Sequence, residues 1–217
     1  MKSLFLFIVI FLIVGCKKDI CQPLDETQPM YGRVEKCKPQ QLADEKFIKA
    51  VEEQYGSKTE AVNSMLRFAW KHFMEGDLDN SMKRFNQAWL LDSLNADVYK
   101  GYGNIMMDKG MDKESIQYFD RYLEIDSTNT EIWRLSALAY IDIYDDSTDK
   151  DGEYLDQAIV RLKKAKGITQ DDARIYGLLT KSYAYKNEID SARKYLKIAE
   201  QMNPDIISKE IKEYILR

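Results

Sequence analysis

Two stretches decide the fold: GDLDNSMKRFNQAWLLDSLN at positions 76–95 and GMDKESIQYFDRYLEIDSTN at positions 110–129. They start 34 residues apart and agree at a glycine, a serine, a phenylalanine, an aspartate and an asparagine: Gly76/Gly110, Ser81/Ser115, Phe85/Phe119, Asp92/Asp126 and Asn95/Asn129. Before them, Ala69 recurs as Gly103 and then as Ala137. This period, with small and aromatic residues at fixed places, is typical of stacked helix pairs that form a curved surface. The pattern predicts a binding surface and names no partner.

The repeated positions resemble tetratricopeptide (TPR) repeats over about residues 60–204. In that family a large–small dyad and an aromatic residue mark the first helix of each pair, and small residues flank an aromatic residue or leucine in the second. The four units carry this pattern at Met65, Phe68, Ala69, His72, Ser81, Phe85 and Ala88; at Tyr99, Tyr102, Gly103, Met106, Ser115, Phe119 and Tyr122; at Trp133, Ser136, Ala137, Tyr140, Ala158, Leu162 and Ala165; and at Tyr176, Leu179, Thr180, Tyr183, Ala192, Leu196 and Ala199. The resemblance implies an all-α, right-handed helical-repeat solenoid of about four TPR units.

Additional helices are expected at both ends of the solenoid. Apolar residues recur at helical spacing over 42–55, and Gly56 would end that helix as a left-handed cap. A last helix over about 205–216 would cover the exposed apolar edge of the final unit. We therefore predict an N-terminal helix at 42–57, the solenoid at 58–204 and a C-terminal capping helix at 205–217.

The N-terminus has the features of an export signal. Lys2 precedes an unbroken apolar run over 4–14, which is too short to cross a bilayer and has the length of the apolar core of a secretory signal. The run ends in Gly15–Cys16, which resembles the bacterial lipoprotein signal. The resemblance implies removal of residues 1–15, lipidation (palmitate-type acylation) of Cys16, and a membrane anchor; the alternative is an ordinary signal followed by a chance cysteine. Lys17 rather than aspartate after Cys16 favours the outer membrane, and the following basic–acidic run is similar to Bacteroidetes lipoproteins.

Residues 16–41 hold three of the four prolines and few apolar groups, so they are interpreted as a lipidated tether. Cys21 and Cys37 form an even pair in an oxidising compartment, where a disulfide between them is expected. Two free thiols in a flexible tether are the alternative.

The third unit is about nine residues longer than its neighbours, and the excess is acidic, at 145–153. Insertions in repeats map to loops on one face, so we expect a projecting acidic loop. Asp149, Asp151 and Gly152 partly fit a calcium-binding loop, but its closing glutamate is missing. Solvated carboxylates are the favoured interpretation, and no metal site is predicted.

Nothing in the chain indicates catalysis. His72 is the single histidine and occupies an aromatic packing place, and there is no glycine-rich phosphate loop. We expect neither an enzyme nor a cofactor. The net charge of −4 also argues against a nucleic-acid partner.

The TPR resemblance implies that the first helix of each pair lines a concave groove. The residues expected to face a partner there are Leu66, Trp70, Phe73, Lys100, Asn104, Met107, Arg134, Arg174, Lys181 and Tyr185. Their pattern is aromatic at the entry end and basic further along, in a chain that is acidic overall. Lys100 and Asn104 also resemble part of the carboxylate clamp of some TPR proteins, although Gly101 and Leu135 depart from it. A solvated helical face is the alternative to a binding groove.

Together these features predict a lipid-anchored protein–protein interaction module, a scaffold or assembly adaptor of the bacterial cell envelope. It would bind a segment of an envelope protein in its concave groove, at the outer membrane rather than the inner membrane. The alternative is a lipoprotein that binds a glycan or small solute on its aromatic residues, although most of these fall on repeat-packing places.

Overall fold

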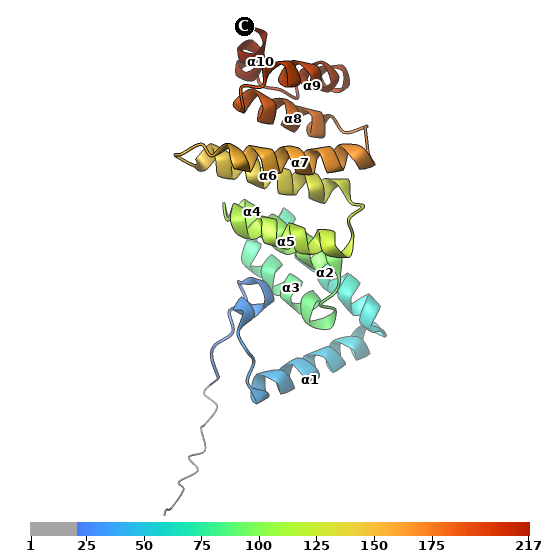
Figure 1. Ribbon diagram of the computed structural model, residues 1–217. Coiled ribbons are helices and arrows are strands. Elements are labelled where there is room, and N and C mark those ends of the chain that lie inside the picture. Colours follow the sequence, from blue (N-terminus) through green and yellow to red (C-terminus); the bar gives the residue numbers. More distant parts are fainter. Residues whose placement is uncertain (1–20) are drawn as a thin grey trace, which may run out of the picture.

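The computed structural model describes residues 21–217 and contains ten α-helices and no strand within that range (Figure 1). The predicted signal peptide and Cys16 lie outside the described residues. The helices, in chain order, are α1 (Lys38–Tyr55), α2 (Lys58–Met74), α3 (Leu78–Leu91), α4 (Ala96–Asp108), α5 (Asp112–Ile125), α6 (Thr130–Asp146), α7 (Gly152–Ile168), α8 (Ala173–Tyr185), α9 (Ile189–Met202) and α10 (Lys209–Leu216), preceded by a short turn, η1 (Pro29–Arg33). This all-helical architecture confirms the predicted fold class.

The helix boundaries follow from local capping chemistry. Asn95 and Asn129, one period apart, accept hydrogen bonds from the N–H groups of Asp97 and Glu131 and so cap α4 and α6. Such a cap satisfies one of the N–H groups that the first helical turn leaves without a partner. Gly76 and Gly110 adopt left-handed backbone angles, φ 76° and 70°, in the tight turns inside the first two pairs. A residue with a Cβ would be strained there.

Small residues let paired helices approach. Ala69 is fully buried on α2, where its carbonyl accepts a hydrogen bond from the Ser81 hydroxyl of α3 at 3.0 Å. On α4, a Cβ added to Gly103 would overlap the ring of Phe119 from α5. The small positions of the repeat are therefore places where a neighbouring large side chain already fills the space.

The helices stack in four pairs, α2/α3, α4/α5, α6/α7 and α8/α9. Figure 1 shows them rising in sequence order, with the N-terminal segment at one end and α10 at the other. The first helix of a unit also meets the first helix of the next unit, because α2 contacts α4 and α6 contacts α8. These contacts draw the stack together on the side of α2, α4, α6 and α8, which is therefore its inner, concave side.

The buried core has two parts that meet at α6. One cluster runs from Val51 to Ile132, and the other runs from Ala137 to Ile215. Trp133 packs partly against both clusters. The first two units and the last two units thus have separate cores joined by one helix.

The N-terminal segment differs from the predicted tether. Over 25–34 it packs on α3, where the fully buried Asn86 side chain donates to the carbonyls of Glu26 and Gln28 and accepts from the Met30 N–H. Pro29 and Tyr31 are buried. The segment is therefore a strap over the second helix of the first unit, because long-range hydrogen bonds to Asn86 hold backbone that has no local regularity.

A disulfide joins Cys21 to Cys37, immediately before α1. The first helix begins at Lys38 instead of residue 42, because Cys37 and Gln40 form a capping box at its start. Gly56 ends this helix in a left-handed conformation, φ 79°.

The third unit is also built differently from the expectation. Most of the insertion lengthens its helices: α6 and α7 each have 17 residues, whereas α4 and α5 have 13 and 14. The connecting loop is confined to 147–151, and the two helices extend beyond their neighbours at that end (Figure 1). The apolar period explains this, because Leu155 continues the buried face of α7 up to its start.

The C-terminal end is closed by α10 and by the chain that leads to it. The connector between α9 and α10 packs at Gly177 of α8, with Ile206 Cγ1 at 3.1 Å from the place a Cβ would occupy. Ile207 and Ile215 are buried in the second cluster. The connector itself thus covers the inner part of the last unit.

Candidate binding surface

The aromatic entry end of the predicted groove is largely used for packing. Trp70 meets Phe73 and the buried Phe85 edge to face, with ring centroids 5.6 and 5.1 Å apart. Leu66 is buried. Trp70 and Phe73 stay half-buried against the N-terminal core, so they offer a partner only part of each ring.

The two residues that resembled a carboxylate clamp are both engaged within the chain. Lys100 Nζ lies 2.6 Å from Glu131 Oε2 and 5.7 Å from the Trp70 ring centroid. The hydrogen bond from Lys100 is the main cause that lowers the pKa of Glu131. Asn104 Nδ2 donates to the Lys100 carbonyl at 2.8 Å. Both side chains therefore already have a partner within the chain. Met107 is half-buried beside them on α4.

At the far end, two of the three predicted basic residues are also paired. Arg174 holds Asp172 through two hydrogen bonds of 2.9 Å, in a side-by-side fork. Lys181 Nζ lies 2.8 Å from Asp145 Oδ2 and over the ring of Tyr185. Tyr185 in turn stacks on Tyr144 at 5.5 Å. The positive charges of this end are therefore mostly neutralised on the spot.

Arg134 is the exception among these basic residues. Only 9% of its surface is exposed, it forms no ion pair with any carboxylate in 21–217, and its Nε has no hydrogen-bond partner. Burial is the main cause that lowers the pKa of Arg134; the positive charge of Arg174 lowers it further, and the carboxylates of Asp172 and Glu131 oppose the shift. A buried guanidinium without an ion pair is a group that an added anion would stabilise.

A cavity lies over Arg134 on the concave side, between α6, α8 and the chain around the start of α10. Its volume is about 480 Å³, and its lining combines three basic residues with five aliphatic ones: Arg134, Leu138, Arg174, Gly177, Leu178, Lys181, Tyr185, Ile206, Ile207, Ser208 and Ile211. We call this cavity the C-terminal pocket. Four of the predicted groove residues meet here, namely Arg134, Arg174, Lys181 and Tyr185.

Sequence reasoning missed the aliphatic wall of this pocket. The predicted cap over 205–216 includes Ile206, Ile207 and Ile211, and these three residues also line the pocket. A run of isoleucines on both sides of a helix start is more than one edge needs, and that excess was the available signal.

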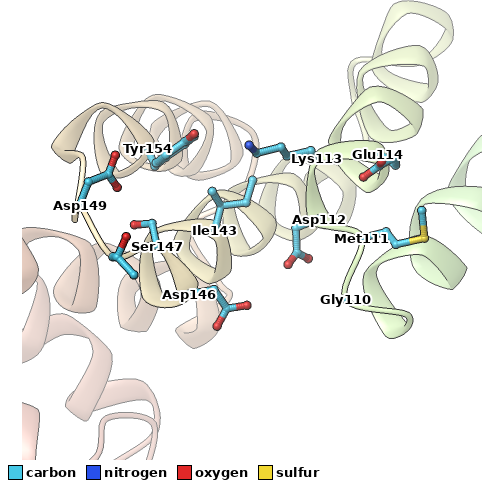
Figure 2. Close-up of a pocket in the computed structure, with 11 residues that line it drawn as sticks. Gly110, Met111, Asp112, Lys113, Glu114, Ile143, Asp146, Ser147, Asp149 and Tyr154 are labelled. Atoms are coloured by element: carbon cyan, nitrogen blue, oxygen red, sulfur yellow. The ribbon is translucent and has the colours of Figure 1, made fainter.

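A second cavity, of about 570 Å³, lies at the other side of α6, between the start of α5 and the loop that joins α6 to α7. Figure 2 shows its acidic rim, with Asp112 and Asp146 on facing elements and Asp149 in the loop. Burial is the main cause that raises the pKa of the nearby Asp142 to about 6, and Asp112 adds to it. No group of three or more His, Cys, Asp or Glu side chains within 21–217 is placed to hold a metal ion.

The single histidine sits at the end of α2 next to carboxylates. His72 Nδ1 is 3.4 Å from Asp77 Oδ2 and 3.8 Å from Glu75 Oε2.

No helix in the described part of the chain has the length and apolarity needed to cross a membrane.

No family model matches the sequence, and no curated protein matches it. Solved structures do resemble it. TTC0263, a thermophilic TPR protein of Thermus thermophilus, has a TM-score of 0.56 and 18% identity, over 71% of this chain and 79% of that protein. A crystal structure of MamA has a TM-score of 0.58 and 20% identity, over 73% and 87% of the two chains. PilF of Pseudomonas aeruginosa has a TM-score of 0.57 and 16% identity, over 76% and 79%.

Identities this low carry information about the fold and not about ligands. Together with the repeat-by-repeat packing, they show that this chain is an all-helical TPR-repeat solenoid.

Proposed function

We propose that this protein is a lipid-anchored interaction module of the bacterial envelope, which binds a segment of another envelope protein along its concave side. The observation that carries the proposal is the C-terminal pocket. It combines an aliphatic wall with a buried guanidinium that has no partner in the described chain. Binding sites commonly pair an apolar lining with a few polar groups that fix orientation.

The anchor is proposed from the sequence around Cys16. Lipid on that residue would tie the N-terminal strap to a membrane, through the few residues that precede the disulfide at Cys21. The C-terminal pocket lies between α6, α8 and α10, toward the opposite end of the stack (Figure 1). Such an arrangement would hold the pocket away from the lipid and open to a protein in the aqueous part of the envelope.

The solute-binding alternative has less support from the positions of the aromatic residues. Tyr102 is fully buried, and Tyr99, Tyr118 and Tyr176 are buried in the packing between helices. Flat stacking on a sugar needs an exposed ring face, which these residues do not offer.

Site-specific photo-crosslinking in intact cells tests the concave side. A photoreactive phenylalanine analogue would replace Leu138, which lines the C-terminal pocket, or, as the control, Val160, which is 53% exposed on α7. The expected result is a discrete adduct from position 138 that is absent from position 160. Equal adducts at both positions, or none at 138, would contradict the proposal.

The anchor has its own test. Cys16→Ser should abolish incorporation of an alkyne-labelled fatty acid and move the protein from the membrane fraction to the soluble fraction. Cys21→Ser serves as the control, because it removes a cysteine from the same region and should leave the label in place. Retention of the label in Cys16→Ser would refute lipidation at this residue.

A further inference from the structure

The buried cation in the C-terminal pocket results from a charge reversal between successive repeats. The units align on the aromatic residue in the first turns of each inner helix: Tyr99, Trp133 and Tyr176. The residue after it is Lys100 in the second unit and Arg134 in the third. The residue two places before it is Glu131 in the third unit and Arg174 in the fourth. Lys100 Nζ lies 2.6 Å from Glu131 Oε2 across the unit boundary. Arg134 forms no such pair, and burial and the nearby positive charge of Arg174 lower its pKa. The chain supplies a carboxylate to the first cation and withholds it from the second.

Neutralising groups near Arg134 are already committed. Asp172 is held in a fork by Arg174, and Asp145 pairs with Lys181. Glu131, which is also close enough to act on Arg134 electrostatically, accepts from Lys100. Among the three basic residues that line the pocket, Arg134 is therefore the one without an ion pair in the described chain, and only 9% of its surface is exposed.

The pocket is also suited to an aliphatic side chain. Leu138 and Leu178 come from the inner helices, and Ile211 comes from α10. A ligand that placed an aliphatic group on these residues and a negative charge on Arg134 would match both parts of the lining.

We propose that the C-terminal pocket binds an acidic side chain, Asp or Glu, that neighbours an aliphatic residue in an extended segment of the partner. This rests on the proposed function and gives it a specificity. The carboxylate accepts hydrogen bonds from the Arg134 guanidinium, which is the planar, bidentate geometry that guanidinium groups and carboxylates share. The aliphatic neighbour packs on Leu138, Leu178 and Ile211.

The apolar lining and the depth of Arg134 select this ligand over other anions. A phosphate group gives the apolar residues of the pocket nothing to bind. A main-chain terminal carboxylate lies directly on the backbone, whereas a side-chain carboxylate reaches below the concave surface to the buried guanidinium. The inner side also continues past Arg134 toward Lys100, so a segment can run through without ending.

The test uses three synthetic peptides with identical Gly-Ser flanks and an acetylated N-terminus. One carries a central Leu-Glu and an amidated C-terminus. The second replaces Glu with Gln, and the third keeps Gln but has a free C-terminal carboxylate. Titration into the folded solenoid, followed by NMR of the Arg134 Nε–H and of the leucine and isoleucine methyl groups, gives both affinity and location. The Glu peptide should bind about tenfold or more tightly than either Gln peptide and should shift the Arg134 resonance.

One variant tests the charge reversal itself. Arg174→Glu places a carboxylate where Glu131 stands in the preceding unit, so it should pair with Arg134 and reduce binding of the Glu peptide about tenfold. Lys164→Gln, which removes one exposed positive charge from α7, is the matched control and should leave binding unchanged. Circular dichroism of both variants verifies that helicity is retained.

Each other outcome overturns the proposal. Equal affinity for the Glu and Gln peptides would show that the pocket does not recognise a side-chain carboxylate. Preference for the peptide with the free C-terminus would show that it recognises the main-chain carboxylate instead. A Glu peptide that binds without moving the Arg134 resonance places the contact elsewhere, and absence of binding at millimolar peptide ends the assignment. These failures are distinct from failure of the proposed function, because a specific crosslink from position 138 would stand without any preference for glutamate.

Discussion

The two halves of the solenoid share a repeat but use it differently. In the first two units the inner residues contact one another: Trp70 packs on Phe85, and Lys100 is paired with Glu131. In the last two units the inner side holds a cavity of about 480 Å³ over the unpaired Arg134. Equivalent positions of the repeat therefore lie at the same place in each unit but contact different residues. Those contacts depend on the neighbouring unit and on the chain ends.

Close packing in the second unit should be the most sensitive feature. Gly101→Leu installs the residue that the third unit carries at the corresponding place, Leu135. A Cβ at Gly101 overlaps the ring of the fully buried Phe85, so we expect a loss of about 3 kcal/mol or more in the free energy of unfolding. Urea denaturation measures it.

The control for that substitution lies in the other half. Gly167→Leu on α7 adds a side chain where nothing lies within 4 Å, and helix propensity favours it by up to about 1 kcal/mol. Equal losses from the two substitutions would mean that the close approach at Gly101 does not exist.

The strap on the first unit should depend on Asn86. Asn86→Ala leaves the Met30 N–H, the Tyr102 hydroxyl and two strap carbonyls without their buried partner, at a cost of about 2 kcal/mol. Hydrogen exchange over 26–31 should rise together with the loss of stability. Asp120→Ala, one period later, removes only a part-exposed pair with Arg161 and should cost less than about 1 kcal/mol. Unchanged exchange in the strap would show that something other than Asn86 holds it.

The equivalent cations of the two halves should respond with opposite sign. Arg134→Met removes a buried charge without a carboxylate partner and should stabilise the protein by about 1 kcal/mol. Lys100→Met breaks a part-exposed ion pair and should destabilise it by about 0.5 kcal/mol. Thermal denaturation of both variants in the same buffer measures the difference. A larger loss from Arg134→Met than from Lys100→Met would mean that Arg134 already has a partner.

A smaller, pH-dependent effect should distinguish Asp142 from Asp108, its exposed equivalent on α4. Burial first, and then Asp112, Asp145 and Asp146, raise the pKa of Asp142 to about 6 against the opposing effect of Lys181. The folded state therefore holds a proton that the unfolded state has released between about pH 4 and pH 6, and stability falls as the pH rises through that window.

Asp142→Asn removes this cost above pH 6. After allowance for the screening of a half-exposed group, the gain should be about 1 kcal/mol at pH 8 and close to zero at pH 4. Melting temperatures at the two pH values give the result. A variant that is stabilised equally at both would point to packing instead of ionisation.

Much of the fold was predictable because its causes are local. Gly76 and Gly110 mark turns that need a left-handed residue, and Asn95 and Asn129 cap the helices that follow them. The small residues at 69, 103 and 137 indicated where helices approach. Each of these effects acts within one turn or one helix pair, so the 34-residue period carries it directly.

The strap and the lengthened helices of the third unit did not follow from the sequence pattern, for different reasons. Prolines and sparse apolar residues at 16–41 are typical of a tether, and only the hydrogen bonds from Asn86, 56 to 60 residues away in sequence, hold the described part of it in place. The insertion at 145–153 is acidic enough to indicate a loop, yet capping by Asp151 and the burial of Leu155 carry helix into it. In each case one or two residues outweighed the composition around them.

The sequence by itself determined the class of fold and the number of units, because a repeat that cannot bury its own apolar face must stack with its neighbours. The sequence also predicts a lipid anchor at Cys16, because that prediction depends only on the local signal sequence and not on the fold. Only the tertiary structure decided which inner residues form ion pairs within the chain. Lys100 pairs with Glu131 and Arg174 pairs with Asp172, whereas Arg134 has no partner in the described chain. The physical reason is that the Lys100–Glu131 pair and the lack of a pair at Arg134 depend on distances across unit boundaries, and those distances exist only after the helices have stacked.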